Sequence, residues 1–171
     1  RVRIIGLSSA EDYEQADLIE GIQDGEQWQK NKEFLELCTV PIACAVPRGH
    51  ELASRRLLTL DDMRGKTLVT IAPGMSELLD GLRAKAIAAG VHVIDADWYR
   101  MSLFSMCIVN GYLLQTPACW RDIHPDLITI PCEWEYALPY GLYYHKNPSV
   151  PVRAFLDFVR VLGRTERFQL Y

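Results

Sequence analysis

The stretch TVPIACAVPRGH, residues 39–50, determines how the rest of the chain must be organised. Its central residues, 42–46, are apolar on both alternating faces, which is typical of a β-strand covered on both sides. Pro41 and Pro47 suit the two ends of such a strand, because proline cannot donate to the hydrogen-bond ladder. Gly49 then permits a turn. We therefore predict a buried strand that leads from one structural unit into another.

The composition is that of a globular protein. The 171 residues suffice for one domain or two small lobes, and 49% hydrophobic with 23% charged residues can build a core. No run reaches the ~20 apolar residues that a membrane span requires, and residues 1–6 lack a signal-peptide pattern, so we expect no membrane partner. A formal net charge of −4 argues against nucleic-acid binding by this chain itself, because phosphate recognition needs clustered positive charge.

The five cysteines are odd in number, widely spaced and mostly set among apolar neighbours. This pattern favours reduced thiols that act as small hydrophobic residues over a disulfide framework. We therefore expect a cytoplasmic protein with free thiols at Cys38, Cys44, Cys107, Cys119 and Cys132.

Strand and helix patterns alternate along the chain, which predicts the α/β class. The helices, predicted from caps and apolar stripes, are 10–15, 76–89, 98–109 and 150–162. Strands are predicted at 2–5, 16–22, 34–39 continuing into the opening stretch, 66–71, 91–94, 112–115, 127–130 and 138–145. The last helix is expected to end at Gly163 and to bury Val152, Phe155, Leu156, Val159 and Leu162.

The alternating block of residues 66–130 lies between two outer segments. We predict an outer lobe of residues 1–41 with 139–171 and an inserted inner lobe of residues 42–138. Strand, helix and strand over residues 2–22 predict a parallel sheet in the outer lobe. Two crossing strands, the opening stretch and 138–145, would join the lobes, and such an arrangement makes a hinge and an inter-lobe cleft suited to a small ligand.

Five segments resemble, in the same order, motifs of the effector-binding domain of LysR-type transcriptional regulators. They are ADLI at 16–19 with Ile22, IACAVPRGHELA at 42–53, TLDDMRG at 59–65, VNGYLL at 109–114 with Pro117, and VRAFLDF at 152–158. The resemblance extends over residues 2–162. It implies the two-lobed fold of type 2 periplasmic binding proteins, in which each lobe is a mixed, mainly parallel sheet with flanking helices.

Two positions depart from the family pattern. Glu51 stands where the family usually has proline after histidine, and Tyr112-Leu113 replaces the second glycine of its G-x-G. The family's first strand, its first helix and its N-terminal helix-turn-helix have no counterpart in this sequence.

The resemblance implies an effector-sensing domain rather than an enzyme, with no cofactor and no metal. A small molecule, for instance a carboxylate, would bind between the lobes and shift a homodimer or homotetramer. DNA contact would come only from an N-terminal domain that is not in this chain. Carried over by position, the ligand-binding residues are Ser8, Ser9, Pro73, Gly74, Met75, Ser76, Asn110, Gly111 and Tyr140.

The chemistry of these residues fits, because hydroxyls and N–H groups at helix N-termini hold carboxylates. Each also has a purely structural interpretation. Ser9 and Ser76 suit helix caps, Pro73 and Gly74 a turn, and Asn110 a helix end.

Other functions remain open at this point. The four histidines lack metal-ligand spacing, and no nucleophile or phosphate-loop motif is present. The carboxylate pairs Asp95 with Asp97 and Glu133 with Glu135 suit solvated loops better than acid–base chemistry. The alternatives are a solute-binding protein or enzyme of the same two-lobed fold, and an interaction module whose cleft is filled by Tyr140 or Met75.

Overall fold

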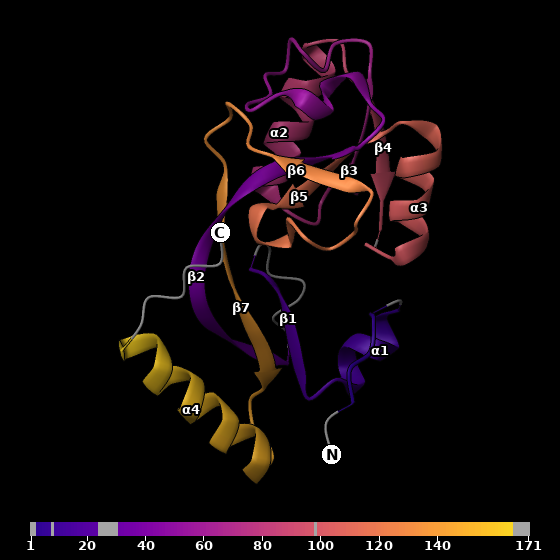
Figure 1. The fold of residues 1–171 in the computed structure, drawn as a ribbon. Helices are drawn as coiled ribbons and strands as arrows, with labels where there is room; N and C mark the ends of the chain where they lie inside the picture. Colours follow the sequence, from indigo (N-terminus) through magenta and orange to yellow (C-terminus); the bar gives the residue numbers. More distant parts are fainter. Residues whose placement is uncertain (1–2, 8, 24–30, 98, 166–171) are drawn as a thin grey trace.

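The structure, a computed structural model, describes residues 3–7, 9–23, 31–97 and 99–165 (Figure 1). Its α-helices are α1 (Ala10–Gln15), α2 (Glu77–Ala88), α3 (Met101–Asn110) and α4 (Val150–Thr165), and two short 3-10 helices are η2 (Glu51–Ser54) and η3 (Ala118–Trp120). The strands are β1 (Leu18–Ile22), β2 (Lys32–Pro47), β3 (Thr67–Ile71), β4 (His92–Ala96), β5 (Leu113–Pro117), β6 (Leu127–Ile130) and β7 (Ala137–His145).

The opening stretch forms the second half of β2, a strand of 16 residues that runs through both halves of the molecule (Figure 1). Residues 32–41 of β2 pair with β7, whereas residues 42–47 pair with β5 and β6. Residues 42–47 are all buried, which confirms the predicted buried strand. The strand begins seven residues earlier than the stretch that identifies it.

The inner sheet contains parallel and antiparallel pairs. β3 is parallel to β4 and β5, and β2 is antiparallel to β5 and β6. Helix α2 covers one face, where Ala86 joins the cluster of Leu68 and Leu113. Helix α3 covers the other face, where Phe104 packs with Leu114. This arrangement confirms the predicted α/β class with helices on both faces of a mixed sheet.

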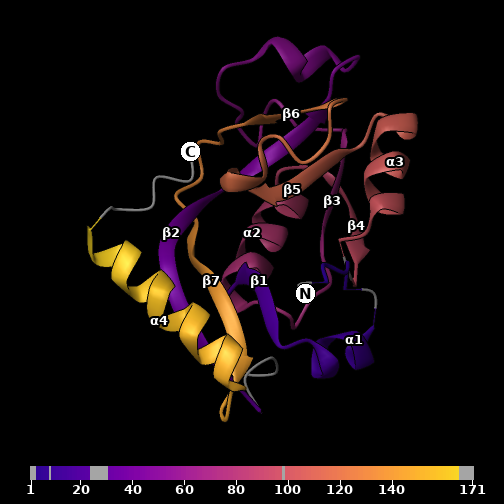
Figure 2. The same ribbon diagram turned by 60° about the horizontal axis from the view of Figure 1, so that its bottom comes forward.

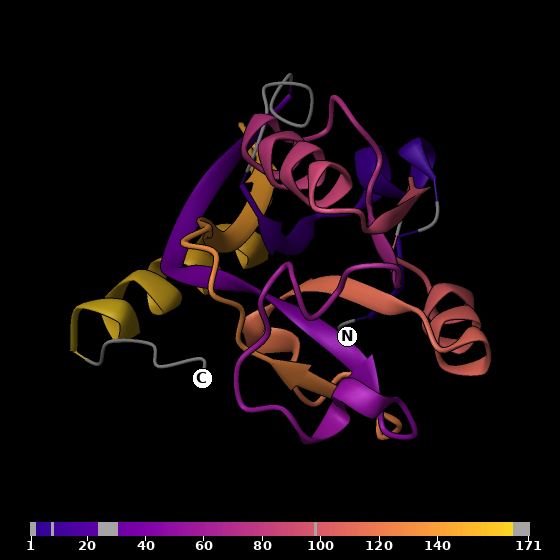
Figure 3. The ribbon, with the colours of Figure 1, turned by 90° about the horizontal axis from the view of Figure 1, so that it is seen from above.

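The outer sheet has the order β1, β7, β2, and every described pair in it is antiparallel. Helix α1 lies on one face, where Tyr13 packs with Tyr143, and α4 lies on the other, where Arg160 bonds Tyr144. In Figure 3, seen from above, α4 lies on the far side of β2 from α2 and α3. The prediction of a mainly parallel outer sheet is therefore wrong for the described strands.

Three local predictions are also wrong. Residues 3–5 form no strand, because Ile4 is 94% exposed and no described sheet edge lies beside it; residue 2 lies outside the described residues. Helix α4 continues through Gly163 to Thr165, since one glycine near a helix end costs only about 1 kcal/mol. Phe155 is 47% exposed, whereas Leu156 and Val159 are buried, because the sheet covers only a narrow stripe of α4.

Candidate functional site

The carboxyl ends of three parallel strands meet at one edge of the inner sheet. Ile71 at the end of β3 pairs with Ala96 at the end of β4, and Leu68 pairs with Leu113 at the start of β5. The turns that follow β3, β4 and β5 therefore lie along the same edge. In open α/β sheets this is the edge where ligands bind.

The turn after β3 is held in one conformation by its own hydrogen bonds. Gly74 has a φ of +83°, which favours glycine, and its N–H donates to Oδ2 of Asp80 over 2.9 Å. The Oγ of Ser76 accepts from the N–H of Leu79 at 3.0 Å and caps α2. Met75, between them, is half-buried. The cap places the positive end of the α2 dipole at the ligand edge, and it leaves the proton of the Ser76 hydroxyl available for donation.

Ser9 has the corresponding position on α1, where its Oγ accepts from the N–H of Asp12 at 3.1 Å. The cap interpretation and the ligand interpretation are compatible, because this bond uses a lone pair of the oxygen and leaves the hydroxyl proton. Ser8 lies outside the described residues.

Tyr140 is buried in the protein, with 3% of its surface exposed. Its hydroxyl donates to Oε1 of Glu20 at 2.5 Å and accepts from Nε1–H of Trp120 at 3.2 Å. Burial and the bond to Glu20 hold the pKa of Tyr140 well above its ordinary value. The phenol has only one proton, and it is donated to Glu20 in this hydrogen bond. Tyr140 therefore has no donor left for a ligand.

Asn110 and Gly111 lie at the opposite edge of the inner sheet. Helix α3 starts where β4 ends and runs back to the start of β5, so its last residues reach the amino ends of the strands. Gly111 closes the helix with a φ of +68°, and the Asn110 side chain donates to the carbonyl of Met106 over 2.8 Å. The structure therefore does not bring this pair together with the 73–76 turn.

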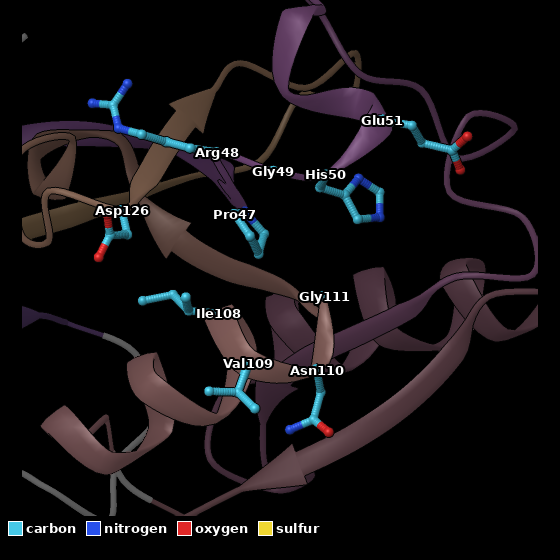
Figure 4. A pocket seen from close by; sticks show the side chains of 10 residues that line it. All are labelled: Pro47, Arg48, Gly49, His50, Glu51, Ile108, Val109, Asn110, Gly111 and Asp126. Atoms are coloured by element: carbon cyan, nitrogen blue, oxygen red, sulfur yellow. The ribbon is translucent and has the colours of Figure 1, made fainter.

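These two residues line a surface groove of about 710 Å³ instead (Figure 4). Figure 4 shows the His50 ring and the Val109 side chain on either side of it. Nδ1 of His50 accepts from the N–H of Leu52 at 3.1 Å, so the ring is fixed by its own loop. Burial, followed by the charge of Lys66, lowers the pKa of His50. The groove is lined by residues 47–51, 108–111 and 126.

Sequence reasoning missed three side chains near the ligand edge. Tyr99, in the turn between β4 and α3, donates its hydroxyl to the carbonyl of Gln115 over 2.8 Å. Its ring meets the Trp120 ring edge-on at a centroid distance of 5.7 Å. Trp120 and Glu20 are joined through Tyr140. Aromatic content alone hints at this cluster, because its members are far apart in the chain.

The described part of the chain contains neither a metal site nor a membrane-spanning helix. No three His, Cys, Asp or Glu side chains are grouped so that they could hold a metal ion. None of the described helices is long and apolar enough to cross a membrane. All five cysteines, each of them described, are free thiols.

A family model of the LysR substrate binding domain matches residues 14–163. The chain belongs to this family. The family assignment that the sequence resemblance implied is thereby confirmed, and the chain is an effector-binding regulatory domain of the LysR type. A comparison with curated proteins found no match.

Solved structures confirm the fold of this LysR substrate-binding domain. The effector binding domain of QuiR in complex with shikimate is 21% identical, with a TM-score of 0.61 over 91% of this chain and 77% of that one. The regulatory domain of Synechocystis PCC6803 CcmR in complex with 2-PG is 12% identical, with a TM-score of 0.60 over 88% and 75%. HinK, a LysR family transcriptional regulator from Pseudomonas aeruginosa, is 13% identical, with a TM-score of 0.60 over 88% and 54%.

Proposed function

We propose that this LysR substrate-binding domain senses a small anionic molecule that binds between an outer lobe, residues 1–41 with 139–171, and an inner lobe, residues 42–138. One observation carries the proposal. Ile22, at the end of β1, packs on the cluster formed by Ile42, Leu79 and Leu138, so the edge that bears the α2 turn faces the outer lobe. Figure 2 shows β1 and α1 below the inner strands on that side.

The chemistry of this edge favours an anion. The first turn of α2 offers the backbone N–H groups of Glu77 and Leu78, because that of Leu79 bonds Ser76. It also offers the positive end of a 12-residue helix, whose first turn carries the carboxylates of Glu77 and Asp80 as well. Ser76 adds a hydroxyl proton, and the proposed contacts are Ser9, Pro73, Gly74, Met75 and Ser76, with Ser8 as a further candidate from the sequence. Asn110 and Gly111 belong to the opposite edge, and Tyr140 has no donor left for a ligand. None of these three residues is therefore part of the site that we propose.

Further features of the proposal concern the whole regulator. We infer a non-enzymatic cytoplasmic domain of a homodimer or homotetramer, in which ligand binding shifts an equilibrium between lobe arrangements. Contact with DNA is assigned to a separate domain. The net charge of −4 supports the assignment of DNA contact to a separate domain. The five free thiols support the cytoplasmic location.

A thermal-shift screen tests the ligand site. The probes are shikimate, 2-PG and a panel of small carboxylates and phosphate esters, each compared with a neutral analogue. A ligand at a hundredfold excess over its Kd adds about 2.7 kcal/mol to the free energy of unfolding. The stabilisation should be lost in Ser76→Ala and retained in Asn110→Ala, a matched control at the other edge. A shift that survives Ser76→Ala and disappears in Asn110→Ala would place the ligand in the groove instead.

A further inference from the structure

Tyr140 joins side chains from elements that are distant in the sequence. Trp120, on η3, donates its indole N–H to the Tyr140 oxygen at 3.2 Å, and Tyr140 donates to Glu20 of β1 at 2.5 Å. On the other side, Trp120 meets the Tyr99 ring edge-on with an interplanar angle of 85°. The contacts thus form one continuous path, Tyr99 to Trp120 to Tyr140 to Glu20.

This path connects the two halves of the molecule through side chains, and it crosses Tyr140 on β7, one of the two strands that also link the halves covalently. Tyr99 and Trp120 belong to the inner half, and Glu20 lies on β1, whose described pairing is with β7 alone. Tyr140 sits on β7 opposite Ile22 of β1. The path therefore ties the inner turn between β4 and α3 to the outer sheet.

The direction of the hydrogen bonds makes the contacts interdependent. An indole N–H can only donate and an ionised carboxylate can only accept, so Tyr140 must accept from Trp120 and donate to Glu20. The hydrogen bond to the Glu20 carboxylate polarises the Tyr140 phenol and strengthens the hydrogen bond that the phenol accepts from Trp120. Because Tyr140 is almost fully buried, water cannot readily replace either partner.

We propose that Tyr140 is a positioning residue that couples the turn between β4 and α3 to β1. Arg100, next to Tyr99, is the N-cap of α3 and lies at the ligand edge of the inner sheet. A change in the conformation of this turn is thereby transmitted to β1 in the outer lobe. Only the link to effector sensing rests on the proposed function, because the coupling itself is a property of the unliganded chain.

A double-mutant cycle on the unliganded chain tests the coupling. The variants are Trp120→Phe, Glu20→Ala and the double variant, and the quantity measured is the unfolding equilibrium constant in urea. Because both side chains act on one hydroxyl, the double variant should depart from the product of the two single effects by about fivefold. Additive effects, within about twofold, would overturn the proposal.

The cycle is repeated in two backgrounds. In Tyr140→Phe the departure from additivity should vanish, since the shared hydroxyl is absent. In Tyr144→Phe it should persist, because Tyr144 lies on the same strand and the same sheet face but bonds Arg160. Equal loss in both backgrounds would mean that general weakening of β7, and not Tyr140, carries the coupling.

Hydrogen exchange gives a readout in the opposite lobe. Trp120→Phe should speed the exchange of amides 18–22 in β1, although the substitution lies in the inner half. Unchanged exchange in β1 would contradict the proposal. A failed ligand screen would leave both results standing, so the two proposals can fail separately.

Discussion

The ammonium nitrogen of Lys32 lies 2.9 Å from the carbonyl oxygen of Ala16, although Lys32 is only 3% exposed. Ala16 is the C-cap of α1, so the cation sits at the negative end of the helix. The same nitrogen lies 3.2 Å from Nε2 of His145 and 5.3 Å from the centre of the Tyr13 ring. These contacts attach α1 to the outer sheet, and with it the Ser9 end of the proposed site.

Burial of Lys32 predicts a specific dependence of stability on pH. Desolvation lowers its pKa below the ordinary 10.5, although the charges of Glu14 and Asp17 act in the opposite direction. The unfolded chain then binds the proton more tightly, so the free energy of unfolding should rise with pH in the window between the lowered pKa and about 10.5. Tyr13, with its pKa raised by burial to about 12, stays neutral there.

Urea denaturation of the wild type and Lys32→Met, compared at neutral pH and at pH values up to about 10.5, measures this contribution. Other groups titrate in both proteins and cancel in the difference. The wild type should gain stability relative to Lys32→Met as the pH rises. A constant difference across the window would show that Lys32 has the same pKa folded and unfolded.

A second prediction concerns two glycines that face each other across β1 and β7. A Cβ on Gly141 would collide with the carbonyl oxygen of Leu35 and lie 2.9 Å from the end of the Phe34 ring, whereas a Cβ on Gly21 meets nothing within 4 Å. Gly141→Ala should therefore cost about 3 kcal/mol, because backbone must shift. Gly21→Ala, its matched control, should change stability by less than about 1 kcal/mol. Similar denaturation midpoints for the two variants would refute this difference.

Much of the fold could be predicted because it is encoded locally. The apolar run at 42–46 identifies the buried part of β2, and the stripe and cap of α2 are visible as Ser76 followed by spaced leucines. The turn at 73–76 follows from the same signals. Each of these features depends on neighbours within a few residues, which is the range over which periodicity and capping act.

The remainder depends on contacts between distant segments. Grouping Asn110 with the 73–76 turn fails because the strand order decides which turns share an edge, and periodicity does not contain that order. Lys32 follows a polar segment in the sequence, and its burial arises only when α1 folds over the outer sheet. Glu20 and Tyr140 are 120 positions apart, so no local pattern connects them.

Helix α4 offers a test of which apolar side chains stabilise the outer lobe. Leu156 is fully buried, whereas Phe158 on the same helix is 60% exposed. Leu156→Ala should cost about 3 kcal/mol from lost burial and the resulting cavity. Phe158→Ala should change the free energy of unfolding by less than about 0.5 kcal/mol, as exposed substitutions do. Chemical denaturation at low protein concentration measures both, and a large loss in Phe158→Ala would mean that this face is covered in solution.

The side chain of Gln115 on β5 supplies the last prediction. Both its amide nitrogen and its amide oxygen are buried without a hydrogen-bond partner in the described part of the chain, and the residue is 2% exposed beside the fully buried Cys44. An unsatisfied buried amide is costly, so Gln115→Met, which keeps the shape, should raise the free energy of unfolding by about 1–2 kcal/mol. The control is Gln15→Met, in which an exposed glutamine on α1 loses its bond to Glu11. There the effect should be close to zero. A fall in stability for Gln115→Met would mean that the amide has a partner in solution, and a buried water molecule bonded to it is then the arrangement to seek.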